Sequence, residues 1–238
     1  MAITYPDTYL LANSSTELDR LYLQAKVWEP EAEVMLDHIA VQPGWKCVDL
    51  GCGGMSILQS LSRRVGIQGH IIGVDNDPRQ LAAACDYVRD NQLENVDILE
   101  QDIYHTRLPR EFFDLTHARC LFAAANHDEE LLREMLSLTR SGGILAIQEP
   151  DVTSWKCYPT DPAWEQLNRI VLDAFKPGGS DFNVGQRIFK MLRHAGLEDV
   201  NQNCRCCFTR PTFLQTTPHS ICNFTASTHF RGWLNQCF

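Results

Sequence analysis

Short apolar runs recur through the first two thirds of the chain, and stretches with the period of an amphipathic helix separate most of them. The apolar runs predict strands at 47–50, 71–75, 96–100, 113–117 and 144–148. The helical stretches between them are 56–65, 78–91 and 128–138. This alternation predicts a parallel sheet covered by helices on both faces. We therefore expect an α/β fold with a doubly wound, mostly parallel sheet.

The region before the first strand is predicted to be helical. Residues 14–17 read Ser-Ser-Thr-Glu, the pattern of a capping box, and Leu18, Leu21 and Ala25 would share one face of the helix that follows. Pro30 predicts the start of a second helix, because proline is favoured in a first helical turn. We expect these two helices to form an N-terminal helical cap.

The pattern is looser after residue 150. It predicts helices at 162–175 and 184–195, a strand at 199–208, and a helical segment within 220–238. We find no internal repeat or linker and expect a single domain over 1–238, with the cap at 1–43 and the core at 44–150. Residues 151–238 would supply a helical lid insert, near 150–182, and a C-terminal region.

Composition narrows the function. The chain has 21 Lys and Arg against 30 Asp and Glu, a formal charge of −9, which would repel a phosphate backbone and disfavours a nucleic-acid partner. We find neither a stretch of about 18 apolar residues nor an export signal, so we expect no membrane partner and a cytoplasmic protein. The 10 cysteines lack the paired C-x-x-C spacing of zinc sites, and we predict no metal site.

The strand at 47–50 leads into a glycine-rich turn, Gly51-Cys52-Gly53-Gly54. Glycines let backbone N–H groups approach a ligand closely, which is typical of a nucleotide-like cofactor site. A nicotinamide-dependent dehydrogenase would need G-x-G-x-x-G, and Ser56 stands where its third glycine belongs. With Asp49 two positions before Gly51, the segment instead resembles motif I of class I S-adenosylmethionine-dependent methyltransferases.

The resemblance extends over about residues 44–150, where further strand endings fit the same family. It implies S-adenosylmethionine as cofactor, with its methionine part at Asp49 and the glycine turn, and with the ribose hydroxyls at Asp75. Asn76 would flank the adenine, Asp102 would accept from its amino group, and Ile103 would pack on the ring. The cofactor-binding residues expected on this basis are Asp49, Gly51, Cys52, Gly53, Asp75, Asn76, Asp102, Ile103 and Arg119.

The sequence departs from the family pattern at two places in the core. Met55 stands where the third glycine of the family's loop commonly falls. Many relatives carry a Glu-His pair after the fourth strand, and the alignment puts Ala123 and Ala124 there. The remaining candidates for proton transfer are His117, at the end of that strand, and His127, at the start of the next helix.

The tail gives the third departure. Family members usually end with an antiparallel hairpin, whereas we predict a single strand followed by a helical segment after residue 199. A missing last strand would leave a sheet edge to be covered by a second copy, which favours a homodimer.

The resemblance implies methyl transfer to a small acceptor, and we expect a natural-product-like metabolite of secondary metabolism. Two alternatives remain open. One is an enzyme that holds the cofactor but catalyses a cyclisation or rearrangement, suggested by the empty Glu-His position. The other is a non-catalytic binding module, suggested by Met55 and the short tail.

Overall fold

The computed structural model describes residues 16–152, 155–176, 180–197, 199–206 and 220–227. Its strands are β1 (Lys46–Leu50), β2 (His70–Asp75), β3 (Val96–Glu100), β4 (Phe113–Arg119), β5 (Thr139–Pro150), β6 (Asn201–Cys206) and β7 (Ser220–Ser227). Its helices are α1 (Glu17–Ile39), α2 (Leu58–Val65), α3 (Pro78–Asp90), α4 (Asp128–Leu138), α5 (Pro162–Phe175) and α6 (Gly185–His194).

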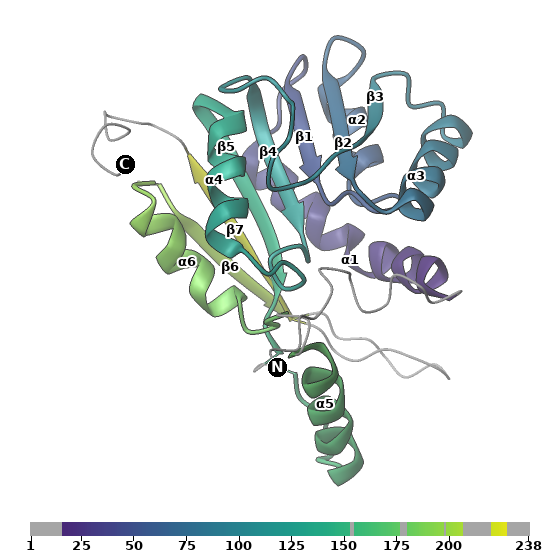
Figure 1. The fold of residues 1–238 in the computed structure, drawn as a ribbon, viewed down its shortest axis with the longest axis vertical. Helices are drawn as coiled ribbons and strands as arrows, with labels where there is room; N and C mark the ends of the chain where they lie inside the picture. Colours follow the sequence, from purple (N-terminus) through teal and green to yellow (C-terminus); the bar gives the residue numbers. More distant parts are fainter. Residues whose placement is uncertain (1–15, 153–154, 177–179, 198, 207–219, 228–238) are drawn as a thin grey trace, which may run out of the picture.

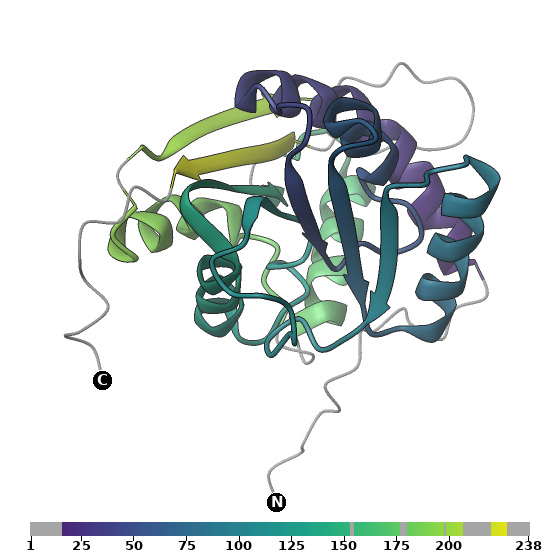
Figure 2. The same ribbon diagram turned by 90° about the horizontal axis from the view of Figure 1, so that it is seen from above.

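The strands form one sheet in the order β3-β2-β1-β4-β5-β7-β6. The first five strands in this order pair in parallel, as the alternating sequence pattern predicts. Residues of α1 and α2 pack on one face of the sheet, and residues of α4 and α6 pack on the other. The two layers are visible from above in Figure 2, where purple α1 and teal α4 lie on opposite sides of the sheet. The expected doubly wound fold is confirmed.

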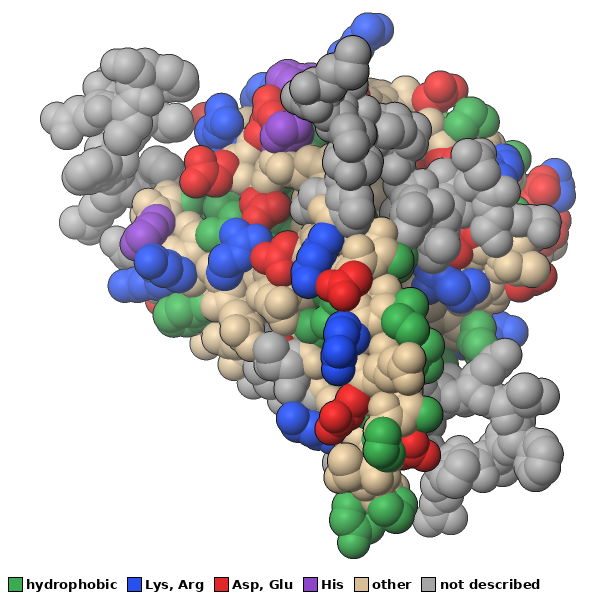
Figure 3. Space-filling model, turned by 60° about the horizontal axis from the view of Figure 1, so that its bottom comes forward, with side chains coloured by type: hydrophobic (Ala, Val, Ile, Leu, Met, Phe, Trp, Pro, Cys, Tyr) green, Lys and Arg blue, Asp and Glu red, His purple; other side chains and the backbone are tan. Residues whose placement is uncertain are grey.

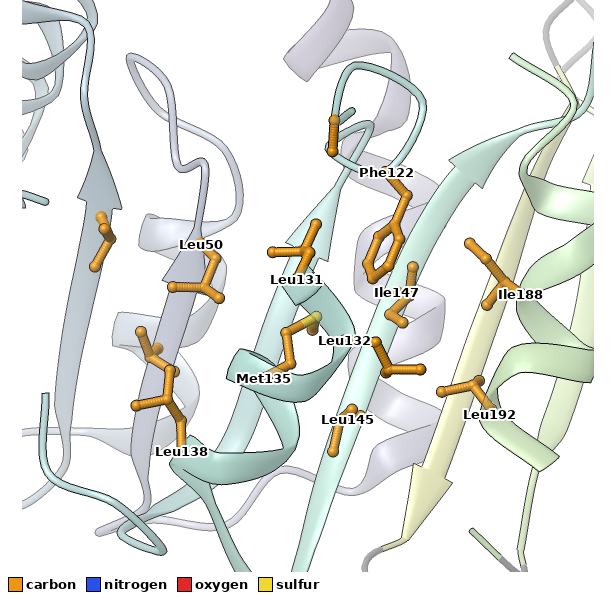
Figure 4. Packing of buried hydrophobic residues seen from close by; sticks show 14 of the residues in the cluster. Leu50, Phe122, Leu131, Leu132, Met135, Leu138, Leu145, Ile147, Ile188 and Leu192 are labelled. Atoms are coloured by element: carbon orange, nitrogen blue, oxygen red, sulfur yellow. The ribbon is translucent and has the colours of Figure 1, made fainter. Parts of the chain in front are cut away.

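Helix α4 shows how the core is built. Leu131, Met135 and Leu138 recur at helical spacing, and all three are fully buried against the sheet. Figure 4 shows them on the strand side of α4, near Leu50 of β1 and Leu145 of β5. Buried Leu and Met side chains each contribute about 1.5 to 3 kcal/mol relative to exposure, so this stripe holds α4 to the sheet.

The N-terminal region differs from the prediction of two helices. It forms a single helix, α1, which contains Pro30. The helix starts after Thr16, whose side chain makes no capping hydrogen bond, while Ser14 and Ser15 lie outside the described residues. Packing explains the continuity: Trp28 and Ala32, on either side of the proline, are both buried against the sheet layer and outweigh the lost backbone hydrogen bond.

The prediction of a helical tail is wrong for residues 220–227, while residues 228–238 lie outside the described residues. Residues 220–227 form β7, which pairs antiparallel with β5 on one side and β6 on the other. Ile221, Phe224 and Thr225 favour a strand, but the pairing partners lie far away in sequence and no local pattern reveals them. The hairpin expected of the family is present, so a missing strand no longer supports a homodimer.

Helix α5 projects away from the sheet, below the rest of the molecule in Figure 1. None of its residues is buried, and Leu167 and Ile170 are 50% and 57% exposed. Figure 3 shows apolar side chains along this projection, with acidic and basic side chains interspersed among them and over the rest of that face. Among the described helices, none is both long enough and apolar enough to span a membrane.

Candidate functional site

A cavity of about 70 Å³ lies between α1 and the glycine turn after β1 and opens to solvent. Its walls come from four parts of the fold that the sheet brings together. They are Leu18, Leu21, Tyr22, Gln24 and Ala25 of α1, residues 51–56 of the turn, Gln80 of α3, and Arg119 at the end of β4.

The turn itself presents backbone to this cavity. Gly51 and Gly53 have φ angles of +65° and +53°, in the region that favours glycine. The Cys52 side chain is 1% exposed, and its Sγ would lie 3.0 Å from a Cβ placed on Gly73 of β2. Burial raises the pKa of the Cys52 thiol well above its usual value. Cys52 therefore contributes its backbone to the site, while its thiol packs against the sheet.

Asp75, the last residue of β2, is tied to the turn. Its Oδ2 accepts from the Gly53 N–H at 2.9 Å, and its Oδ1 accepts from the N–H groups of Asn76 (2.8 Å) and Asp77 (3.0 Å). Burial raises the pKa of Asp75, and these three donors act in the opposite direction. A carboxylate oxygen has two acceptor sites, so Oδ2 keeps one for a ligand hydroxyl.

The residues predicted to meet the adenine lie at an open rim next to Asp75. Asp75 of β2 pairs in register with Glu100, the end of β3, and Asp102 and Ile103 follow directly. Asn76 and Asp102 are exposed and Ile103 is half-buried. Asp102 Oδ1 accepts from the Tyr104 N–H at 2.9 Å, which fixes the carboxylate beside the rim. The structure thus brings the predicted ribose and adenine residues to one edge of the sheet.

Asp49 and His117 lie elsewhere. Both are fully buried inside the sheet layer, and His117 Nδ1 lies 2.6 Å from Asp49 Oδ1. On its other side, His117 Nε2 is 3.4 Å from Gln148 Oε1. Neither Asp49 nor His117 lines the cavity. They contact each other across neighbouring strands, where Asp49 and His117 are register partners.

The covered end of the cavity contains two polar atoms whose partners are missing from the described part of the chain: Arg119 Nη1 and Gln80 Oε1. Gln80 is 8% exposed, and its Oε1 lies 3.6 Å from the position of a Cβ on Gly53 or Gly54. Desolvation lowers the pKa of Arg119, and nearby Asp49 raises it. Buried polar groups without partners are costly, so these atoms indicate a polar ligand.

The loop after β4 is anchored by a residue that we did not single out as a site residue. Glu149, fully buried at the end of β5, accepts from the N–H groups of Leu121 (2.8 Å), Phe122 (2.8 Å) and Ala123 (3.1 Å). Desolvation raises the pKa of Glu149 to about 8, although the three donors lower it. An acidic residue at a strand end is the same signal that indicated Asp75, so the sequence did contain this clue.

His127, the second histidine candidate, is exposed at the N-terminus of α4 and does not line the cavity. Its ring packs edge-on against Tyr104, with centroids 5.6 Å apart. Ala123 is buried and Ala124 is half-buried at the position of the family's Glu-His pair. The described residues therefore place no acid–base group in the cavity wall at that position.

Within the described part of the chain, no three His, Cys, Asp or Glu side chains gather as metal ligands. The cysteine cluster at 204–207 falls where side chains are not described.

The site fits the cofactor that the sequence resemblance implies. Residues of the glycine turn line the cavity, Arg119 Nη1 and Gln80 Oε1 lack hydrogen-bond partners among the described residues, and the Asp75 carboxylate is bonded to the turn at Gly53. These features complement an amino-acid zwitterion at one end and an adenosine at the other.

Comparison with known proteins gives the same picture. A family described as "Methyltransferase domain" matches residues 42–194. The chain is 30% identical over 161 residues to an arsenite methyltransferase of Halobacterium salinarum, covering 68% of this chain and 39% of that protein. It is 32% identical over 116 residues to the ubiquinone/menaquinone biosynthesis C-methyltransferase of Vibrio campbellii, covering 48% of this chain and 44% of that protein. The chain thus spans less than half the length of these curated relatives.

Among solved structures, a SAM-dependent methyltransferase from Aquifex aeolicus superimposes with a TM-score of 0.65 at 18% identity. The match covers 90% of this chain and 97% of that one. At this identity, the likeness supports the fold.

Proposed function

The chain belongs to the class I S-adenosylmethionine-dependent methyltransferases, and from this premise we propose that it transfers a methyl group to a small-molecule acceptor. The observation that carries the proposal is the cavity at the glycine turn, to which the Asp75 carboxylate is bonded through the Gly53 N–H. The cofactor is S-adenosylmethionine. The acceptor we propose is a small, natural-product-like metabolite, consistent with relatives named for arsenite and quinone methylation.

We assign the cofactor to residues of the 44–150 core. The backbone of Gly51, Cys52 and Gly53 would face its amino-acid part, and the free acceptor site of Asp75 would take a ribose hydroxyl. Asn76, Asp102 and Ile103 would flank the adenine, and Arg119 would meet the buried end. Asp49 would act indirectly, since it lies outside the cavity wall and is bonded to His117. Residues 151–238 would form the acceptor side of the same domain.

When bound, the cofactor supplies a methyl group on a positively charged sulfonium, which an acceptor can displace in line. The chain's own task is to hold and align the reactants and to keep water out, and α1 covers the turn in a way that suits this task. The described cavity wall contains no carboxylate or imidazole. We therefore favour an acceptor that is already nucleophilic near neutral pH, such as an amine or an anion.

His127 remains the better candidate for direct proton transfer, because it is exposed and lies at the start of α4. His117 is fully buried, so any role in the reaction would pass through Asp49. Replacing His127 by Ala should leave cofactor affinity unchanged. A fall in turnover with unchanged cofactor affinity would support proton transfer by His127.

The first test is calorimetric titration of the protein with S-adenosylmethionine and S-adenosylhomocysteine. We expect both to bind, and we expect Asp75→Ala to weaken binding by roughly tenfold to a hundredfold, because hydrogen bonds to a charged group contribute about 1.5 to 3 kcal/mol. Asp86→Ala, at an exposed position on α3, is a control with the same charge change. Unchanged affinity of the Asp75 variant would contradict the ribose assignment.

Measurements on the same protein also distinguish methyl transfer from two alternative functions. The small residues Ala123 and Ala124 keep open a cofactor-bound cyclisation or rearrangement without methyl transfer. A product 14 mass units heavier than the acceptor, as one added CH2 requires, would exclude this reaction. A folded sample that binds neither ligand would favour a non-catalytic binding module.

A further inference from the structure

Two residues of the cavity wall, on different elements of the fold, each have a buried side-chain atom without a hydrogen-bond partner. Arg119 Nη1, at the end of β4, can donate, and Gln80 Oε1, in the first turns of α3, can accept. Both residues line the same cavity. For each of these atoms, the described residues offer no hydrogen-bond partner. A ligand with an acceptor and a donor at one end would satisfy both.

The N-terminus of α2 is a second feature that favours binding of a negatively charged group beside Arg119. Residues 55–57 lead into this eight-residue helix, and Met55 and Ser56 line the cavity. The N-cap residue Ile57 makes no side-chain capping bond, and the first turn contains no acidic residue. The first backbone N–H groups of a helix lack intrahelical partners and carry partial positive charge. The Leu58 N–H donates to Met55 O at 3.2 Å, so an anion near Ser56 would meet the remaining N–H groups of this turn together with Arg119.

We propose that Arg119 and Gln80 form a two-point receptor for the α-amino-acid end of the cofactor. Arg119 Nη1 donates to the carboxylate, and Gln80 Oε1 accepts from the ammonium. This inference rests on the proposed function and specifies which residues distinguish the intact cofactor from derivatives without its amino-acid group. The family resemblance had directed the ammonium to Asp49 instead.

The geometry favours Gln80 over Asp49 for this role. Asp49 Oδ1 lies 2.6 Å from His117 Nδ1, and Asp49 Oδ2 also lacks a partner among the described residues, but Asp49 does not line the cavity. Gln80 does line the cavity, and its Oε1 lies 3.6 Å from the position of a Cβ on Gly53 or Gly54.

Truncated ligands test this receptor without any measurement of activity. S-adenosylmethionine has both groups, decarboxylated S-adenosylmethionine keeps only the ammonium, and 5′-methylthioadenosine has neither. By calorimetry, Arg119→Met should weaken S-adenosylmethionine roughly tenfold to a hundredfold and leave the decarboxylated ligand within about threefold. Gln80→Met should weaken both ammonium-containing ligands by roughly threefold to tenfold and leave 5′-methylthioadenosine unchanged.

Arg119→Lys retains a cation and should recover part of the lost affinity. Arg133→Met, at an exposed position on α4, removes the same charge outside the cavity and should bind every ligand as the parent protein does. Thermal unfolding of each variant, without ligand, establishes that the chains are folded. If the Arg119→Met protein is unfolded, ligand binding by Arg119→Lys and Gln80→Met tests the receptor instead.

The results separate this inference from the function on which it rests. If the parent protein binds S-adenosylmethionine but Arg119→Met weakens all three ligands equally, the receptor is wrong and the cofactor assignment stands. If the parent protein binds neither S-adenosylmethionine nor S-adenosylhomocysteine, the proposed function fails and the receptor fails with it.

Discussion

Glu149 is a carboxyl group that the fold keeps away from water and surrounds with the backbone N–H groups of the loop after β4. Its pKa is raised from 4.5 to about 8. Because the pKa is higher in the folded state, the corresponding stability is present below about pH 4.5 and is lost as the pH rises to about 8. We expect the free energy of unfolding to decline over this interval.

The variant Glu149→Gln isolates this contribution because its side chain does not titrate. Its amide nitrogen cannot accept from an N–H, so the variant should be less stable at low pH by about 1 to 3 kcal/mol. The stability difference between the two proteins should then narrow as the pH rises. Urea denaturation at several pH values measures it, and a pH-independent difference would contradict the raised pKa.

At the scale of single residues, the sequence predicted where a residue lies in the fold better than which residues its side chain contacts. Asp75 and Asp102 were identified because strand ends meet at one edge of a parallel sheet and because these strand endings resemble those of the methyltransferase family. The burial of Asp49 against His117 depends on the register between β1 and β4, which the strand pattern does not encode. Gln80 was missed because a polar residue on a helix usually faces water, and only the packing of α3 against the turn buries it.

Among the helices, α1 contains a proline that lowers its stability. Pro30 lies exposed inside the helix, where its missing N–H leaves one backbone carbonyl without its helical partner. We expect Pro30→Ala to stabilise the protein by about 1 to 3 kcal/mol. Pro78→Ala is the matched control, since Pro78 stands at the start of α3, where its N–H would be unpaired in any case.

Urea denaturation of both variants gives the measurement. Pro78→Ala should be neutral or slightly destabilising, by about 0.5 kcal/mol, because proline there is already set for a helix. A Pro30 variant that is no more stable than the parent protein would indicate that the bend itself is needed for Trp28 and Ala32 to pack.

Element by element, the sequence predicted most helices and the parallel strands to within a few residues. Helices α4 and α5 have the predicted bounds, because their periodicity is strong and their first turns carry clear signals, such as Asp161 before Pro162. Strand β5 begins at Thr139 rather than near 144, since Thr139 pairs with Phe113 of β4, and pairing resumes at Ile144 after an irregularity at residues 140–143. Long-range pairing of this kind overrides local preference.

For the molecule as a whole, α5 should contribute little to stability. Replacing exposed Leu167 and Ile170 of this helix with Ser should change the free energy of unfolding by no more than about 0.5 kcal/mol per substitution. Leu131→Ala in α4, at a fully buried position, should cost about 2 to 5 kcal/mol. Chemical denaturation compares them, and a large loss in the α5 variant would show that this helix packs in solution.

The placement of β7 has a consequence for the order in which the chain can fold. This strand lies between β5 and β6, although it follows both in sequence, and Ile144 of β5 pairs with Ser227, 83 residues later. Strand β6 borders only β7, so it cannot join the sheet until residues 220–227 have been made. On the ribosome, the parallel half of the sheet can form first, while α6 and β6 wait for the late strand. Contacts this distant in sequence slow folding, so we expect closure of the β5-β7-β6 edge to be a late step in acquiring the native state.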